Sequence, residues 1–344
     1  MNIVVLCGGT STEREVSLWT GENVCSALRL KGHNTLLLDV FIGRDDIKPE
    51  QFFELKESIE DELVYIKEKS KDIEEQKKIR KCFFGNNVLE ICMSADIVFM
   101  ALHGENGENG KVQATFDLLG IKYTGADYLS SAMAMNKAVS RKIFLANNVP
   151  MANGTSLYAG EECLSAKDLN LNYPVVVKPS CGGSSIGVFF ANNDSEFKNA
   201  LKNAFEYENE LVIEEKIMGR EFSCGVVKYE AYPVIEIIPK VGEYDFKNKY
   251  EAGATDEICP ANISMELTKK IQDVAVLAAK ALMLDTYCRV DVLTDAEENC
   301  YCLEANTLPG MTKTSLLPQE AAAIGIDFPS LCENLINISL SDRK

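Results

Sequence analysis

The sequence has little of several features that mark common functional classes. Its 344 residues include only two histidines, and none of its twelve cysteines forms a C-x-x-C pair, so a Cys/His zinc site is not expected. No apolar stretch approaches the roughly 20 residues that cross a bilayer. Basic residues number 35 against 52 acidic ones, and the net charge of −17 disfavours binding to nucleic acid or to an anionic membrane. These absences favour a soluble globular protein whose partners are small molecules.

The cysteines and the first residues both predict a cytoplasmic protein. The cysteines are scattered along the chain, which is typical of reduced thiols in the core of a cytosolic protein. The N-terminal MNIVVLCGG lacks a basic leader and has only a short apolar run. It is therefore predicted to be a first strand and not a signal peptide.

Strand and helix patterns alternate in the first part of the chain. An apolar strand at residues 3–7, a glycine turn, a helix to about Lys31 and a strand at 35–40 predict an α/β unit with a parallel sheet. Another strand is expected at 96–102, and after Pro150 strand signals dominate. The predicted fold class is α/β followed by mixed α+β lobes.

Residues 44–92 differ from their surroundings. They are dense in charged residues, with apolar residues spaced for one face of a helix. This pattern favours a solvated amphipathic helical insertion. The alternative is a partner-binding arm, which no specific feature supports.

Residues 175–188 are the best candidate for a phosphate site. The dinucleotide motif G-x-G-x-x-G and a correctly spaced P-loop are both missing from the chain. Here, however, an apolar strand leads to Lys178 and then to a glycine-rich loop that contains Ser184 and Ser185. A buried lysine needs an anion, and glycines let backbone N–H groups approach phosphate oxygens. The alternative is an ordinary hairpin whose lysine reaches solvent.

A second constellation predicts a metal site. Arg289 and Asp291 share one face of a strand, and Glu304 and Asn306 share one face of the next. If the two strands pair through a turn at 295–299, these groups converge. Two carboxylates and an amide oxygen are hard ligands suited to Mg²⁺, and the arginine could stabilise developing negative charge. The alternative is a salt-bridged surface face.

The stretch 211–221 is a weaker candidate. An apolar strand runs into a short charged segment with Gly219 and then into a new strand. Such a crossover can present backbone groups to a purine edge. A simple interdomain connection explains the same pattern.

These segments, in this order, resemble the D-alanine–D-alanine ligase family of ATP-grasp enzymes. The resemblance extends over nearly the whole chain and rests on residues 8–17, 102–104, 123–125, 135–137, 177–187, 249–250, 259–261, 289–291 and 303–312. It implies a three-lobed ATP-grasp fold with ATP between the second and third lobes. The implied lobes are a parallel-sheet domain at 1–126 with its insertion at about 44–92, a central lobe at 127–214 and a C-terminal lobe at 215–344.

The resemblance also implies an activity. The implied reaction is ADP-forming ligation of two D-alanines through a D-alanyl phosphate, for peptidoglycan synthesis, in a homodimer. A D-alanine–D-serine ligase of the glycopeptide-resistance kind is the alternative. A D-lactate ligase is less favoured because Lys249 and Tyr250, which D-lactate ligases lack, are present. A non-catalytic ATP-binding regulator is the alternative of another class.

Site residues are carried over by motif position. The implied contacts of ATP are Lys137, Lys178, Ser184, Ser185, Glu214, Lys216, Ile217 and Glu221. The implied ligands of two Mg²⁺ ions, with Mn²⁺ as an expected substitute, are Asp291, Glu304 and Asn306. The implied contacts of the amino acid substrates are Glu15, His103, Lys249, Arg289, Ser315 and Leu316. The groups implied to act in catalysis are Glu15, Ser184, Tyr250, Arg289 and the Gly310 N–H.

Three departures from the family pattern stand out. The segment 44–92 is longer than in a compact member. Asn109 stands where the family usually has Asp, and Lys216 replaces an aromatic residue common beside adenine. Stacking on adenine from position 216 is therefore not expected.

Overall fold

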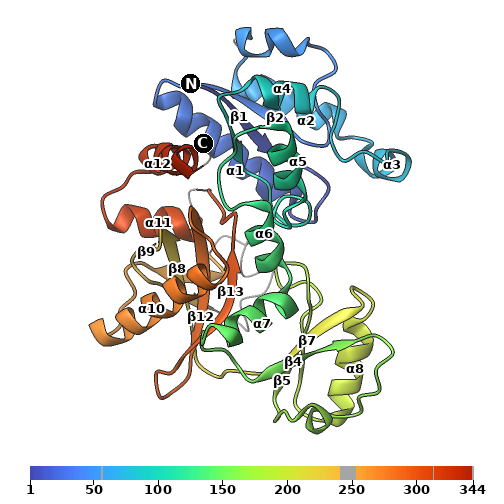
Figure 1. The fold of residues 1–344 in the computed structure, drawn as a ribbon, viewed down its shortest axis with the longest axis vertical. Helices are drawn as coiled ribbons and strands as arrows, with labels where there is room; N and C mark the ends of the chain where they lie inside the picture. The colour runs from blue at the N-terminus through green and yellow to red at the C-terminus, as the bar shows by residue number, and fades with distance from the viewer. Residues whose placement is uncertain (56, 241–252, 313, 343–344) are drawn as a thin grey trace. The chain divides into compact units, whose positions relative to one another are not determined.

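The chain folds into two compact units (Figure 1). The computed structural model describes residues 1–55, 57–240, 253–312 and 314–342. The first unit combines Met1–Leu129 with Thr307–Lys344, and the second is Ser130–Asn306. The boundaries predicted for three lobes remain predictions, and the structure adds that the segment after Asn306 packs with the N-terminal unit.

A parallel sheet forms the centre of the first unit. Its strands are β1 (Asn2–Cys7), β2 (Asn34–Asp39) and β3 (Ile97–Met100), in the order β2-β1-β3. The pairs of β1 with β2 and with β3 are both parallel, as predicted. The strands consist mainly of buried aliphatic residues, as expected for a parallel sheet covered on both faces.

Helices surround this sheet. α1 (Arg14–Leu30) packs on β1 and β2, and α12 (Phe328–Asp342) packs on α1 and β3 (Figure 1). The unit also contains α5 (Lys111–Leu119) and α11 (Leu316–Ala323). α6 (Tyr128–Met135) spans the boundary between the two units in sequence.

The charged segment 44–92 is helical and contributes to the core. It contains the 3-10 helix η1 (Pro49–Glu54), α2 (Ile59–Lys69) and α3 (Ile73–Ile79), and it runs into α4 (Val88–Ser94). Apolar residues of η1 and α4, led by the fully buried Phe52, join the same hydrophobic cluster as the sheet. The segment is thus anchored by burial.

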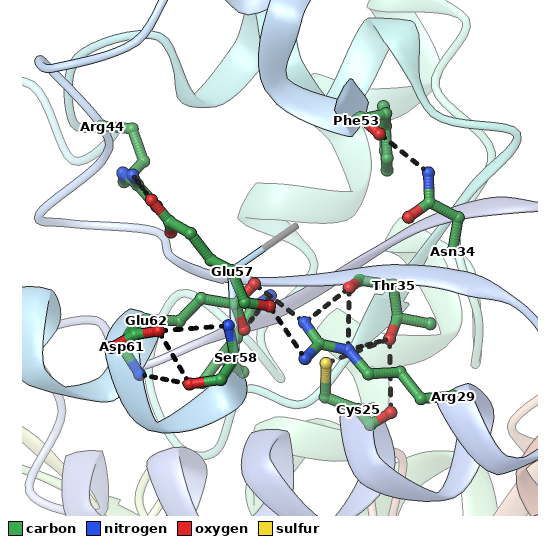
Figure 2. A network of polar contacts seen from close by, with 11 residues as sticks. Cys25, Arg29, Asn34, Thr35, Arg44, Phe53, Glu57, Ser58, Asp61 and Glu62 are labelled. Atoms are coloured by element: carbon green, nitrogen blue, oxygen red, sulfur yellow. Dashed lines mark hydrogen bonds and ion pairs between the residues drawn. The ribbon is translucent and has the colours of Figure 1, made fainter. Parts of the chain in front are cut away.

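A polar network also attaches this segment to the sheet (Figure 2). Arg29 of α1 donates to Glu62 of α2 at 2.9 Å and to the Thr35 carbonyl at 2.8 Å. Arg44 pairs with Glu57 at 3.0 Å and with Asp46 at 2.9 Å. Glu62 is 1% exposed, although a charged helix was expected to keep its carboxylates in solvent.

The second unit contains two sheets. One has the order β4 (Gly154–Tyr158), β7 (Glu210–Glu215), β5 (Val175–Pro179), β6 (Phe189–Ala191), with antiparallel pairs throughout. α8 (Asp194–Ala204) covers this sheet (Figure 1). The short 3-10 helix η2 (Ala166–Leu169) lies between β4 and β5 in the sequence.

The other sheet of this unit is also antiparallel. Its order is β11 (Thr255–Ile258), β10 (Ile235–Pro239), β8 (Arg220–Val227), β12 (Tyr287–Thr294), β13 (Cys300–Asn306), and β9 (Glu230–Ala231) pairs with β8. α10 (Met265–Ala281) packs on β8, β12 and β13 (Figure 1). α7 (Lys137–Ala146) contacts both β7 and α10.

All twelve cysteines are free thiols, and eight of them are buried. Within the part of the chain that the structure describes, no helix has the length and apolar character of a membrane span.

Candidate active site

A pocket of about 440 Å³ lies in the second unit. Its lining comes from β5, β6 and β7 of one sheet and from β8, β10, β12 and β13 of the other. This volume is in the range of small-molecule sites. Every residue that the sequence associated with ATP lines this pocket: Lys137, Lys178, Ser184, Ser185, Glu214, Lys216, Ile217 and Glu221.

Strand register explains why these side chains meet. Val176 of β5 is paired with Glu214 of β7 on one side and with Phe190 of β6 on the other. Residues directly opposite in antiparallel strands project from the same face. Lys178 follows Val176 by two residues and projects from that face as well. The register therefore places a cation, an anion and an aromatic ring on one wall of the pocket.

Lys178 has an anionic partner within the protein. Its Nζ lies 2.6 Å from Glu214 Oε2, and Glu214 Oε1 lies 2.9 Å from Arg141 Nη1. All three side chains are at most 10% exposed. The sequence predicted that a buried Lys178 needs an anion, and the structure provides one in Glu214, which had been assigned only to adenine.

Sequence reasoning missed Arg141. The available signal was its position four residues after Lys137 on one helix, a spacing that places two side chains on the same helical face. The carboxylate that Arg141 binds is Glu214 of β7, which lies 73 residues after Arg141 in the sequence. Helical spacing alone does not predict a partner so distant in the chain.

The loop after β5 has the backbone of an anion site. Gly182 and Gly187 have φ of 121° and 76°, and Ser184 and Ser185 have φ of 54° and 59°. A turn in which left-handed residues alternate with others can direct successive backbone N–H groups toward a common point, where anions bind. Lys137 Nζ donates to the Gly182 carbonyl at 2.7 Å and so fixes the loop to the start of α7.

The crossover from β7 to β8 forms another part of the pocket. The Lys216 N–H donates to the Pro174 carbonyl at 2.8 Å, so this N–H already has a partner within the protein. The Lys216 Nζ lies 4.6 Å from the centroid of the Phe190 ring, which also lines the pocket. An aromatic face is therefore present, although on β6 and not at position 216.

The acidic hairpin forms as predicted. β12 and β13 are antiparallel, and the pairs Arg289–Asn306 and Asp291–Glu304 put all four side chains on one face. Asp291 accepts two hydrogen bonds from Arg289, at 3.0 and 2.9 Å, and one from the Asn306 amide at 3.0 Å. The Ser223 hydroxyl donates to the same carboxylate at 2.9 Å. Asp291 is thus held in one orientation.

A β-bulge changes the prediction for Leu303. Asp291 pairs with Glu304, but Val292 pairs with Cys302, so Leu303 is an extra residue on β13. Strict alternation along β13 predicts Leu303 on the face opposite Glu304. The bulge instead brings Leu303 and its neighbour Glu304 together into the pocket lining. Glu304 Oε2 lies 3.3 Å from Lys137 Nζ.

The donor set of the hairpin fits a hard cation. Asp291 and Glu304 are cross-strand neighbours and supply carboxylate oxygens, and Asn306 supplies an amide on the same face. Oxygen ligands of this kind are preferred by Mg²⁺. Among the described residues, no three His, Cys, Asp or Glu side chains gather in a metal-binding arrangement, so the third protein donor would be the Asn306 amide oxygen.

The substrate residues predicted in the N-terminal unit lie at the carboxyl ends of adjacent parallel strands. Glu15 is in the first turn of α1, after β1, and His103 follows β3. The Ser11 hydroxyl donates to the His103 carbonyl at 2.7 Å, and Thr20 Oγ1 lies 2.9 Å from His103 Nε2. These contacts attach the loop after β3 to the loop after β1 and to α1. Ligands of α/β sheets bind at the carboxyl ends of the strands, where these loops lie.

Residues 307–312, 314 and 315 lie between β13 and α11 in the same unit. Ser315 is the N-cap residue of α11, although its side chain makes no capping hydrogen bond, and Leu316 is the first residue of that helix. The Thr312 N–H donates to Ser315 Oγ at 2.9 Å. A Cβ at Gly310 would approach Ser315 Oγ to 2.8 Å, so a side chain at 310 would press on this cap. Lys249 and Tyr250 lie outside the described residues.

The fold and the phosphate-loop pocket beside the acidic hairpin define an ATP-grasp protein. The chain belongs to the D-alanine–D-alanine ligase family. Family models described as D-ala D-ala ligase N-terminus and C-terminus match residues 2–126 and 142–337. A D-alanine–D-alanine ligase of Pediococcus pentosaceus is 44% identical over 342 residues, covering 98% of this chain and 97% of the relative. One from Lacticaseibacillus casei is 41% identical, covering 98% and 95%.

Solved structures agree with this assignment. The D-alanine–D-alanine ligase from Bacillus anthracis complexed with ATP is similar with a TM-score of 0.75 at 29% identity, covering 100% of this chain and 98% of that one. The VanG D-Ala:D-Ser ligase from Enterococcus faecalis is similar with a TM-score of 0.78 at 26% identity, covering 98% and 99%.

Proposed function

We propose that this protein joins two D-alanines into D-alanyl-D-alanine with cleavage of ATP to ADP and phosphate, for the synthesis of peptidoglycan. The observation that carries the proposal is the pocket of the second unit. There, two lysines and a left-handed glycine- and serine-rich loop lie beside Glu304 of the acidic hairpin. A carboxylate is a poor acyl donor, and such a site can activate it by phosphoryl transfer.

In the first step, a carboxylate oxygen of D-alanine attacks the γ-phosphorus of ATP, and the bond to the ADP oxygen breaks. Lys137, Lys178 and the N–H groups of the loop 182–187 neutralise and position the phosphates. Mg²⁺, held by Asp291, Glu304 and Asn306, would add positive charge at the phosphate oxygens. Glu214 and the 216–217 backbone are proposed to meet adenine, with Glu221 at the ribose.

In the second step, the amine of the other D-alanine attacks the carbonyl of the D-alanyl phosphate, and phosphate leaves. We assign the stabilisation of the oxyanion to Arg289 and to the Gly310 N–H. Asp291 holds the Nε and Nη2 edge of the Arg289 guanidinium, which sets its orientation before substrate arrives. Glu15 is proposed to bind the ammonium of the first D-alanine, with His103 nearby.

The second D-alanine is proposed to bind at the 307–316 loop. Ser315 and Leu316 lie at the N-terminus of α11, and the first turn of a helix favours a carboxylate through its backbone N–H groups. Lys249 is proposed to pair with the same carboxylate. The Tyr250 hydroxyl is proposed to join Glu15 and Ser184 when the site closes over the substrates.

Incubation with ATP and Mg²⁺ tests the proposal. Purified protein receives D-alanine alone, or D-alanine with D-serine or D-lactate, and both phosphate and the mass of the product are measured. We expect D-alanyl-D-alanine in equal amount to phosphate, with Mn²⁺ as a working substitute ion. A mixed product in preference to D-alanyl-D-alanine would point to a D-serine or D-lactate ligase. ATP binding without any product would point to a regulator.

We also propose that the protein is a cytoplasmic homodimer. The twelve free cysteines support a reducing compartment, and the dimer is an expectation from the family alone. Light scattering of the purified protein measures the second point, and a monomer mass at working concentration would refute it.

A further inference from the structure

Arg141 is a buried residue that the reaction described above does not use. It is 5% exposed and lies on α7, outside the lining of the pocket. Its Nη2 donates to the Ala152 carbonyl at 2.7 Å and its Nε to the Gly154 carbonyl at 3.1 Å. Its Nη1 donates to Glu214 Oε1 at 2.9 Å. These bonds fix the guanidinium and direct one of its edges at the carboxylate.

Glu214 connects Arg141 to the pocket. Its second oxygen lies 2.6 Å from Lys178 Nζ, and Lys178 lines the pocket where the phosphate loop begins. The cluster thus contains two cations and one carboxylate, a net charge of +1 in a site with little solvent. A net positive charge that is shielded from solvent costs free energy. An anion that enters the pocket compensates this charge and lowers the cost.

We propose that Arg141 is a positioning residue that prepares Lys178 for a polyphosphate. Arg141 shares Glu214 with Lys178, so the carboxylate does not neutralise Lys178 completely. Without Arg141, the pair of Lys178 and Glu214 has no net charge and the lysine is committed to its internal partner. This inference rests on the proposed function, since it takes the phosphates of ATP as the anion.

The test compares the binding of ATP and of adenosine by calorimetry, with no D-alanine present. Arg141→Met removes the charge and keeps most of the side-chain volume. We expect the Kd for ATP to rise roughly ten- to hundredfold, the weight of a charge-assisted contact. Adenosine, which has no phosphate, should keep its Kd within about threefold. Lys142→Met is the matched control, because it removes the same charge from an exposed neighbouring position on α7.

Two further variants separate charge from packing. Arg141→Met combined with Glu214→Gln restores the net charge of +1. Because Glu214 is also proposed to contact adenine, the readout is the preference for ATP over adenosine, which we expect to be greater than in Arg141→Met alone. Arg141→Lys keeps the charge and should bind ATP within about threefold of the wild type. A merely structural role predicts that Arg141→Met weakens the binding of ATP and of adenosine equally, and that adding Glu214→Gln restores no preference for ATP.

The outcomes distinguish this inference from the proposed function. If the wild type binds no ATP, the proposed function fails. If the wild type binds ATP and Arg141→Met, folded by circular dichroism, binds it equally well, the role of Arg141 fails and the proposed function stands. Equal weakening of ATP and adenosine would also overturn the role of Arg141.

Discussion

Glu62 should make the stability of the N-terminal unit depend on pH in an unusual direction. Its carboxylate is buried under α2, where it accepts a hydrogen bond from Arg29 at 2.9 Å and one from the Leu37 N–H at 3.3 Å (Figure 2). Burial raises the pKa of Glu62 to about 7, because the loss of hydration outweighs the lowering by Arg29 and by the Leu37 N–H.

The sign follows from proton linkage. The ordinary pKa is 4.5, so between that pH and about 7 the folded protein holds a proton that the unfolded chain has lost. The stability contributed by this proton is fully present below the unfolded pKa and is lost as pH rises through the folded pKa. From about pH 5 to about pH 8, this pKa difference corresponds to a loss of roughly 2 to 3 kcal/mol in the free energy of unfolding.

Urea unfolding of the wild type and of Glu62→Gln at several pH values measures this. The only tryptophan, Trp19, lies in α1 and reports on the unit that contains Glu62. We expect the wild type to lose stability relative to Glu62→Gln as pH rises, and the exposed control Glu60→Gln to behave like the wild type. The same pH slope in wild type and Glu62→Gln would refute the reasoning. A wild type that gains stability relative to Glu62→Gln as pH rises would show that Arg29 outweighs burial.

The remaining predictions concern the pocket. Lys178→Ala should lower the rate roughly 10²- to 10³-fold, because a fixed cation at the phosphates is lost, and an unchanged rate and ATP KM would exclude that role. Asp291→Asn and Glu304→Gln should each raise the Mg²⁺ concentration needed for half-maximal activity while circular dichroism stays the same. Full activity of either variant at low Mg²⁺ would show that its carboxylate is not a ligand. Gly219→Ala should lower the Tm, since its Cβ would lie 1.7 Å from the Thr294 backbone oxygen and the β7–β8 crossover would have to move. A thermal melt like that of the wild type would show that the crossover adapts.

Local pattern was sufficient for much of the fold and the site. The apolar runs before Gly8 and before His103 predicted strands of an α/β unit with a parallel sheet, and the structure confirms both strands and their parallel pairing. The spacing of Arg289, Asp291 and Glu304 predicted a shared face, and the register confirms it. In each case the information lies within a few residues, because the period of two in a strand determines which side chains share a face.

Relations between distant segments were not predictable in the same way. Glu214 is the partner of Lys178 because of the register between β7 and β5, and a shift of one residue would have turned it to the other face. The bulge at Leu303 adds a residue that strict alternation cannot predict. The burial of Glu62 depends on where α2 packs on β2, and α2 itself shows only an amphipathic pattern.

The transfer of oxygen from substrate to phosphate tests the central claim most directly. D-alanine labelled with ¹⁸O in its carboxylate is incubated with ATP, Mg²⁺ and the protein, and the released phosphate is analysed by mass. If the carboxylate oxygen attacks the γ-phosphorus and the amine then displaces phosphate, each phosphate released with a dipeptide carries one ¹⁸O. Dipeptide formed together with unlabelled phosphate would contradict the D-alanyl phosphate route.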